Sequence, residues 1–286
     1  MEAKQLYEVL EKDFIKPDYT EEDWLGSFKM NEISEYLSDN FKQRKMGLVC
    51  DFVEDIKKVY TAVFPSDDVM QEIIDEGAED AMLFVHHPAI WDIRKSPDIF
   101  QSMNTKLLDQ FKEKRISIYA LHVPLDDFGE YSTSCTLVKA LGAKPENEFA
   151  PYFGSFSGVF ASTDIKTVQE LKKRFEKAVG HEVNLYNYGS EEIKDGMIAA
   201  IGGGGNQIDM LQQIIDEGIN TFVTGITVRN DYSEKTHQFA EANKLNILGG
   251  THYSTEKFAC IALVNYFTSK GLECRFVEDV PMMEDM

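Results

Sequence analysis

Short apolar runs alternate with amphipathic stretches along the 286 residues of this sequence. Apolar runs such as 81–85 and 116–121 predict buried strands, and amphipathic stretches at 4–14, 30–40, 66–76 and 102–114 predict helices. Strands that alternate with helices are typical of an α/β fold. The sequence therefore predicts an α/β protein, in which functional side chains gather beyond the carboxyl ends of the strands.

The second half of the chain repeats this alternation. Strands are expected at 154–162, 183–188, 196–201, 221–224, 246–248 and 273–277, and helices at 167–179, 207–217, 233–243 and 254–269. Pro, Gly and polar residues gather between Ala143 and Pro151, which predicts a junction between an N-terminal unit, 1–143, and a C-terminal unit, 144–286. The acidic tail from Glu278 to Met286 is expected to be mobile.

Charge and composition exclude several classes of protein. Lys and Arg number 29 against 49 Asp and Glu, and the net charge of −20 argues against a protein that mainly binds nucleic-acid phosphates. The longest apolar stretch, Phe258 to Phe267, is too short to span a bilayer, and the N-terminal residues lack the apolar region of a secretory signal. The four cysteines form no CxxC pair, so we expect neither a disulfide scaffold nor a thiolate zinc site, and a cytoplasmic location.

Four of the six histidines lie where a predicted strand ends. The three places are His86-His87-Pro88, His122 with Asp126, and His252 with Glu256. Each alone has an ordinary explanation, since histidines occur in loops and acidic residues often begin helices. Together, these imidazole and carboxylate groups are hard to borderline ligands that suit a site for two cations, such as zinc, iron or manganese. The other two histidines, His181 and His237, lie in polar stretches and are expected at the surface.

These motifs resemble those of the Nif-three-like dinuclear metal-centre proteins, also labelled GTP cyclohydrolase I type 2 homologues. The order and spacing are similar, and the resemblance covers most of the chain. The matching segments are His86-His87-Pro88, His122-x-x-x-Asp126, Gly202–Gly205, Val223-Thr224-Gly225 and Gly250-Thr251-His252-Tyr253-Ser254-Thr255-Glu256.

The resemblance implies two interleaved α/β units with mixed sheets, the last helix returning to the first unit, and assembly into a toroidal homohexamer. It also implies two divalent metal ions. Their ligands would be His86, His87, Asp126, His252 and Glu256. Glu256 would bridge the two ions, because one carboxylate has two oxygens. His122 would lie near the metals, as a further ligand or as a group that supports one.

The function expected from such a site is hydrolysis of a small substrate, such as a nucleotide or phosphorylated compound, through a metal-bridging water. His122 is the candidate base, and Glu256 is the second catalytic residue. We expect further copies of the chain as partners, and neither nucleic acid nor a membrane. One alternative is a non-enzymatic metal-binding or regulatory scaffold.

Another alternative is a nucleotide-binding module that uses the glycines at 202–205. This run lacks the third glycine of a dinucleotide fingerprint and the Lys-Ser/Thr of a phosphate-binding loop, so a tight, closely packed turn is favoured.

The chain departs from the family pattern at three places. The pair Asp39-Asn40 lies apart from Gly47-Leu48, whereas the family has these pairs close together. The segment 226–231 lacks the acidic residue and histidines that often follow Thr-Gly, and Thr251 replaces a glycine. The expected metal ligands are retained, so we expect these departures to affect the substrate rather than the metals.

Overall fold

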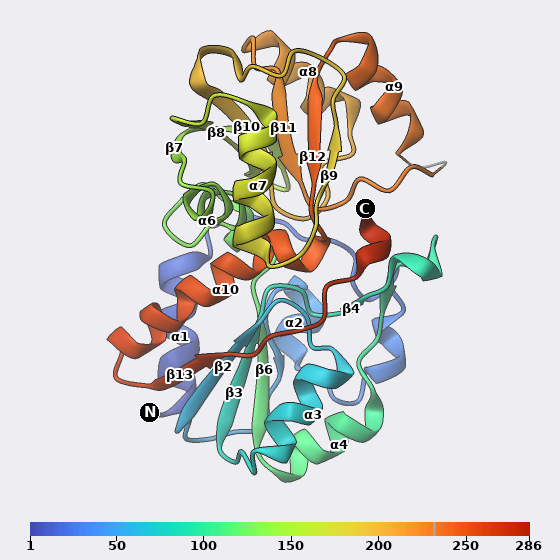
Figure 1. Cartoon of the computed structure of the whole chain (residues 1–286). Coiled ribbons are helices and arrows are strands. Elements are labelled where there is room, and N and C mark those ends of the chain that lie inside the picture. Colours follow the sequence, from blue (N-terminus) through green and yellow to red (C-terminus); the bar gives the residue numbers. More distant parts are fainter. Residues whose placement is uncertain (231–232) are drawn as a thin grey trace. The chain divides into compact units, whose positions relative to one another are not determined.

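The computed structural model of the chain describes residues 1–230 and 233–286 (Figure 1). It consists of two compact units, each built from two segments of the chain. Unit 1 comprises residues 1–125 and 260–280, and unit 2 comprises residues 126–259 and 281–286. The two α/β units are therefore interleaved along the chain, which confirms the predicted fold class. The predicted boundary at residue 143, between units 1–143 and 144–286, stays a prediction.

Unit 1 contains a five-stranded mixed sheet in the order β1-β6-β3-β2-β13. Strands β6, β3, β2 and β13 are parallel, and β1 is antiparallel to β6. The strands are β1 (Gly47–Cys50), β2 (Lys58–Ala62), β3 (Ala81–Val85), β6 (Ile116–Ala120) and β13 (Glu273–Phe276). The other elements are α1 (Ala3–Phe14), η1 (Met30–Ile33), α2 (Asp39–Arg44), α3 (Asp67–Asp75), β4 (Ile90–Trp91), η2 (Ile93–Lys95), β5 (Phe100–Gln101) and α4 (Thr105–Glu113).

Of the helices predicted in unit 1, the one over 66–76 forms as expected, and the one over 30–40 does not. Helix α3 begins as predicted, because the Ser66 hydroxyl accepts the backbone N–H of Val69. The single helix expected over 30–40 is wrong. There the chain forms the short turn η1, and α2 starts anew at Asp39, where the Ser38 hydroxyl accepts the N–H of Phe41.

Unit 2 contains a six-stranded mixed sheet in the order β7-β8-β10-β11-β12-β9. Strands β10, β11 and β12 are parallel, and the other three are antiparallel to their neighbours. The strands are β7 (Lys144–Tyr152), β8 (Ser155–Ser162), β9 (Asn184–Tyr186), β10 (Met197–Ile201), β11 (Thr221–Thr224) and β12 (Asn246–Gly249). The helices are α6 (Thr133–Ala140), α7 (Val168–Val179), η3 (Lys194–Gly196), α8 (Ile208–Asp216), α9 (Glu234–Ala242) and η4 (Met283–Asp285).

The sheet of unit 2 is buried on both faces. Because successive side chains of a strand point to opposite faces, β10 contributes Ile198 and Ala200 to one core and Ala199 and Ile201 to another. The first core includes residues of α6 and α7, and the second includes residues of α8 and α9. Helices that cover both faces explain why these strands are continuously apolar in the sequence.

The segment predicted as a junction, 143–151, is mostly part of β7, which pairs with β8 along its length. β7 is an edge strand, and Pro145 and Pro151 are tolerated at an edge because a missing N–H there need not break the sheet. The composition that resembles a linker is therefore also the composition of an edge strand.

The prediction of a mobile tail is wrong for its last residues. Residues 283–285 form a short helical turn, and Asp285 is fully buried. The backbone carbonyl of Asp285 accepts the N–H groups of Thr227 and Val228, each at 2.8 Å. These bonds make the tail a part of unit 2.

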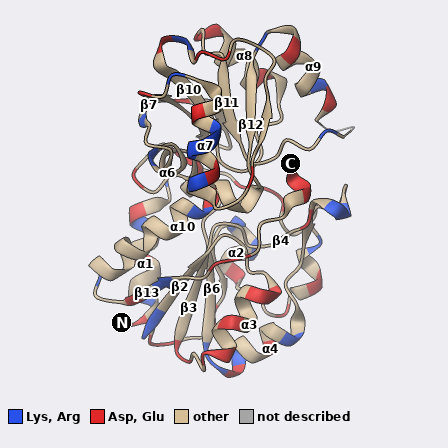
Figure 2. Cartoon of the chain, viewed as in Figure 1, with Lys and Arg blue, Asp and Glu red and all other residues tan. Residues whose placement is uncertain are grey.

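Helix α10 (His252–Ser269) continues from unit 2 into unit 1, with Cys260 as its first residue in unit 1. Acidic and basic residues lie mainly on the helices and loops of each unit (Figure 2). Within the described residues, no helix combines the length and apolar character that crossing a membrane requires.

Candidate metal centre

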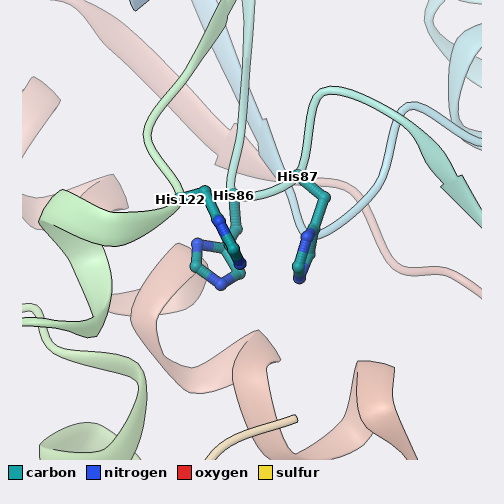
Figure 3. A group of neighbouring side chains, drawn as sticks. All are labelled: His86, His87 and His122. Atoms are coloured by element: carbon teal, nitrogen blue, oxygen red, sulfur yellow. The ribbon is translucent and has the colours of Figure 1, made fainter. Parts of the chain in front are cut away.

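Three buried histidines meet at the carboxyl end of the unit 1 sheet. Strands β3 and β6 are parallel neighbours, with Val85 opposite Ala120. His86 and His87 follow β3 directly, and His122 follows β6 after one intervening residue. Because neighbouring parallel strands end at the same edge, their histidines come together (Figure 3). One ligand nitrogen from each lies within 4.8 Å of those of the other two.

The surroundings of the three histidines orient their rings. His86 Nδ1 lies 3.0 Å from the carbonyl oxygen of Leu121. A carbonyl can only accept, so Nδ1 carries the proton and Nε2 offers the lone pair that a metal needs. The His87 ring stacks on Phe64 with a centroid separation of 4.8 Å, and Trp24 lies edge-on to both His87 and His122.

His122 is held by Glu21, a residue that the sequence analysis missed. Glu21 Oε1 lies 2.8 Å from His122 Nδ1, and Glu21 Oε2 accepts the N–H of Val123 at 3.2 Å. The Glu21 side chain is 1% exposed. It comes from the segment between α1 and η1, far from His122 in sequence, and no motif links the two residues.

Unit 2 contains the other predicted ligands. His252 and Glu256 lie one turn apart at the start of α10, and His252 Nε2 is 3.1 Å from Glu256 Oε1. Asp126 is the last residue of the short helix α5 (Val123–Asp126), and its Oδ1 accepts a hydrogen bond from the Thr133 hydroxyl at 2.9 Å. All three side chains belong to buried residues.

The start of α10 is fixed by hydrogen bonds to Asp285 and Thr251. Asp285 Oδ2 accepts the backbone N–H of His252 at 2.9 Å, and a carboxylate is favourable at the positive end of a helix. Thr251, which replaces a glycine of the family pattern, accepts the Ser254 N–H through its hydroxyl at 3.1 Å. The sequence does not predict a role for Asp285, because the acidic tail from Glu278 to Met286 has the composition of a mobile segment.

The glycine loop after β10 packs against this pair of ligands. Gly203 has a φ of +69°, and a Cβ there would lie 2.3 Å from Glu256 Oε1 and 2.9 Å from His252 Nε2. The Gly202 N–H donates to the Ser134 hydroxyl at 3.0 Å, and the Gly203 N–H donates to the Thr255 hydroxyl at 2.9 Å. These two donors are used within the protein, which supports the prediction of close packing over phosphate binding.

His237 is buried, so its predicted surface position is wrong. His237 Nε2 lies 3.0 Å from the carbonyl oxygen of Thr227, and the Tyr188 hydroxyl lies 3.0 Å from Nδ1. Burial lowers the pKa of His237. The departure from the family pattern at 226–231 lies beside this histidine, although its last residue, Asp231, is outside the described residues.

The structure thus brings together the three predicted histidines of unit 1, and in unit 2 it brings His252 to Glu256. These buried histidine and glutamate side chains have donor atoms that suit a metal ion. Their individual roles as metal ligands stay predictions.

Comparisons with known proteins agree with the resemblance. The family model Duf34/NIF3 (NGG1p interacting factor 3) matches residues 29–281. A GTP cyclohydrolase 1 type 2 homolog of Archaeoglobus fulgidus is 27% identical over 237 residues, which cover 82% of this chain and 89% of the relative. A protein of the same description from Yersinia pestis is 29% identical over 240 residues, which again cover 82% of this chain and 89% of the relative.

Two solved structures have a similar fold. The protein ybgI, described as of unknown function, has a TM-score of 0.73 at 22% identity. The match covers 99% of this chain and 100% of the ybgI chain. Reduced HcgD from Methanocaldococcus jannaschii has a TM-score of 0.67 at 20% identity and covers 98% of each chain. At these identities the two structures establish a shared fold alone.

Proposed function

Because this chain belongs to the Duf34/NIF3 family, we propose that it holds two divalent metal ions and acts as a metal-dependent hydrolase on a small substrate. The observation that carries the proposal is the cluster formed by His86, His87 and His122, whose ligand nitrogens lie within 4.8 Å of one another in a buried setting. Neutral imidazole is the commonest metal ligand in proteins, and three imidazoles whose ligand nitrogens lie this close can share one cation.

The proposed ligands are His86, His87, Asp126, His252 and Glu256, with Glu256 bridging the two ions. Their chemistry suits zinc, iron or manganese, which accept imidazole nitrogen and carboxylate oxygen. Burying a carboxylate is costly unless it is paired, and a divalent ion would compensate Asp126 and Glu256. A bound pair of ions supplies activation of water and stabilisation of charge on a carbonyl or phosphoryl oxygen.

Within this proposal His122 has two candidate roles, as a further ligand or as the base. The sequence relatives are described as GTP cyclohydrolase 1 type 2 homologs, so GTP and other nucleotides come first among the substrates to test. We also propose a homohexamer, for which the family resemblance is the support. Native mass spectrometry would test this assembly.

Metal content is the first experiment. The protein is loaded with zinc or manganese, unbound metal is removed, and the ions that remain bound are counted by elemental analysis. We expect two ions per chain in the natural protein, fewer in Glu256→Gln, and two in Glu217→Gln, which removes an exposed carboxylate of the same unit. Natural protein that retains no metal would contradict the proposal, as would Glu256→Gln that retains both ions.

Turnover is the second experiment. A panel of nucleotides and phosphate esters is incubated with the metal-loaded protein, with Glu256→Gln alongside. Product formation that disappears in Glu256→Gln supports a hydrolase. Tight metal binding with no turnover would refute the proposed hydrolase activity and favour a metal-binding scaffold. Equal turnover in the natural protein and in Glu256→Gln would also refute the proposed hydrolase activity.

A further inference from the structure

We infer that Glu21 positions His122 as a nitrogen ligand of the metal site, so that unit 1 contributes three imidazoles rather than two. The inference rests on the proposed metal binding and decides between the two roles considered for His122. It assigns a function to Glu21, which lies outside every motif of the resemblance.

The Glu21 carboxylate is held from two directions. Oε1 lies 2.8 Å from His122 Nδ1, and Oε2 accepts the backbone N–H of Val123 at 3.2 Å. Oε1 also accepts the N–H of Glu22 at 2.9 Å. An ionised carboxylate only accepts hydrogen bonds, so His122 Nδ1 carries the proton and Nε2 carries the lone pair. Glu21 therefore sets both the tautomer and the orientation of this imidazole.

The His122 ring shares its surroundings with the other two imidazoles. Its centroid lies 5.1 Å from that of His86 and 4.6 Å from that of His87, and the three rings gather where their strands end (Figure 3). His86 reaches the same tautomer through the Leu121 carbonyl. Two imidazoles with their protons on Nδ1 thus lie beside a third, and such an arrangement suits a cation.

A carboxylate on Nδ1 suits either role, because it orients the ring and also stabilises its protonated form. The position of the ring favours the ligand. One ligand nitrogen of His122 lies within 4.8 Å of one from His86 and one from His87, so it faces the same point as theirs. The carboxylate on Nδ1 also increases the electron density at Nε2, which strengthens a metal bond. The geometry therefore favours a ligand over a base.

The test is the affinity for Zn²⁺, measured by competition with a chelator, together with the absorption spectrum of the Co²⁺ form. Glu21→Gln keeps the size of the side chain and removes its charge. We expect a roughly 10- to 100-fold loss of affinity and an altered Co²⁺ spectrum. Glu8→Gln, which removes an exposed carboxylate from α1, should change neither.

A double-mutant cycle separates positioning from general stabilisation of the fold. If Glu21 acts through His122, then Glu21→Gln in a His122→Asn background should cause no further loss of affinity. The thermal midpoint of the metal-free variants is measured alongside, since a purely structural ion pair would lower that midpoint and leave affinity and spectrum unchanged. Should Glu21→Gln fail to fold, Glu21→Asp replaces it, because the shorter side chain withdraws the carboxylate while keeping the charge.

Three results would overturn the inference. They are unchanged affinity and spectrum in Glu21→Gln, unchanged affinity in His122→Asn, and an effect of Glu21→Gln that persists without His122. Natural protein that binds no metal is a different result, because it removes the proposed function itself.

Discussion

Gly203 offers the sharpest test of how the proposed metal centre is built. The substitution Gly203→Ala would place a Cβ 2.3 Å from Glu256 Oε1, and ordinary van der Waals contact begins near 3.4 Å. The carboxylate would have to move by about 1 Å, whereas metal–ligand distances tolerate only about 0.2 Å. The same methyl group would approach His252 Nε2 to 2.9 Å. We therefore expect both proposed ligands to be displaced.

The energetic cost has two parts. A residue with a side chain at a φ of +69° costs about 1–2 kcal/mol, and overpacking a buried site costs a further ~1–3 kcal/mol. Loss of a group that only orients a ligand weakens metal binding roughly 10- to 100-fold, so displacement of the ligands should weaken it by at least about 10-fold.

Gly77→Ala is a matched control. Gly77 has a φ of +72°, and apart from its two chain neighbours no described residue lies within 4 Å of the position of the added Cβ. It should show the conformational cost alone, about 1–2 kcal/mol, and bind metal normally. Stability is measured by urea denaturation of the metal-free proteins, and affinity by chelator competition. Equal losses of stability in the two variants, with metal affinity unchanged in Gly203→Ala, would refute this account of the glycine loop.

Three further predictions use simpler measurements. Asp285→Ala should lower the free energy of unfolding by roughly 1–2 kcal/mol in urea, because the start of α10 loses its carboxylate, and an unchanged midpoint would contradict this role. Burial lowers the pKa of His237, so the unfolded chain binds more protons below pH ~6.5, and stability should fall as the pH decreases from there. His237→Gln should remove that component of the pH dependence, and an identical slope in both proteins would exclude His237 as its source. Removal of metal with a chelator should lower the thermal midpoint of the protein. A metal concentration 100 times Kd should stabilise the folded protein by ~2.7 kcal/mol. A midpoint that changes with neither chelator nor metal would argue against a bound ion.

The histidine cluster of unit 1 was predictable because it depends on local pattern and simple topology. The two apolar runs end directly before His86 and His122, and parallel pairing of those runs brings their ends together. Glu21 and Asp285 were not predictable in this way. Each reaches its histidine through tertiary packing over a long stretch of chain, and neither lies at a helical or strand spacing from it.

Two incorrect predictions, the helix over 30–40 and the surface position of His237, also arise because burial depends on tertiary packing. The apolar residues Met30, Ile33 and Leu37 have a helical spacing and are buried, but a hydrogen bond from the Phe41 N–H to Ser38 begins a separate helix instead. His237 lies among polar residues in sequence and is nevertheless buried. Sequence patterns report which residues suit a helix or a loop, whereas burial depends on which elements pack together.

The interleaving of the two units has a consequence for synthesis on the ribosome. The sheet of unit 1 needs β13, which pairs with β2, and β13 emerges only after residues 126–259 of unit 2. Unit 2 in turn needs Asp285 to complete the start of α10. Unit 1 therefore cannot complete its contacts before β13 has been synthesised, and unit 2 cannot complete its contacts before Asp285 has been synthesised. Unlike chains whose N-terminal domain folds first and alone, this chain can complete both units only when its final segments are available.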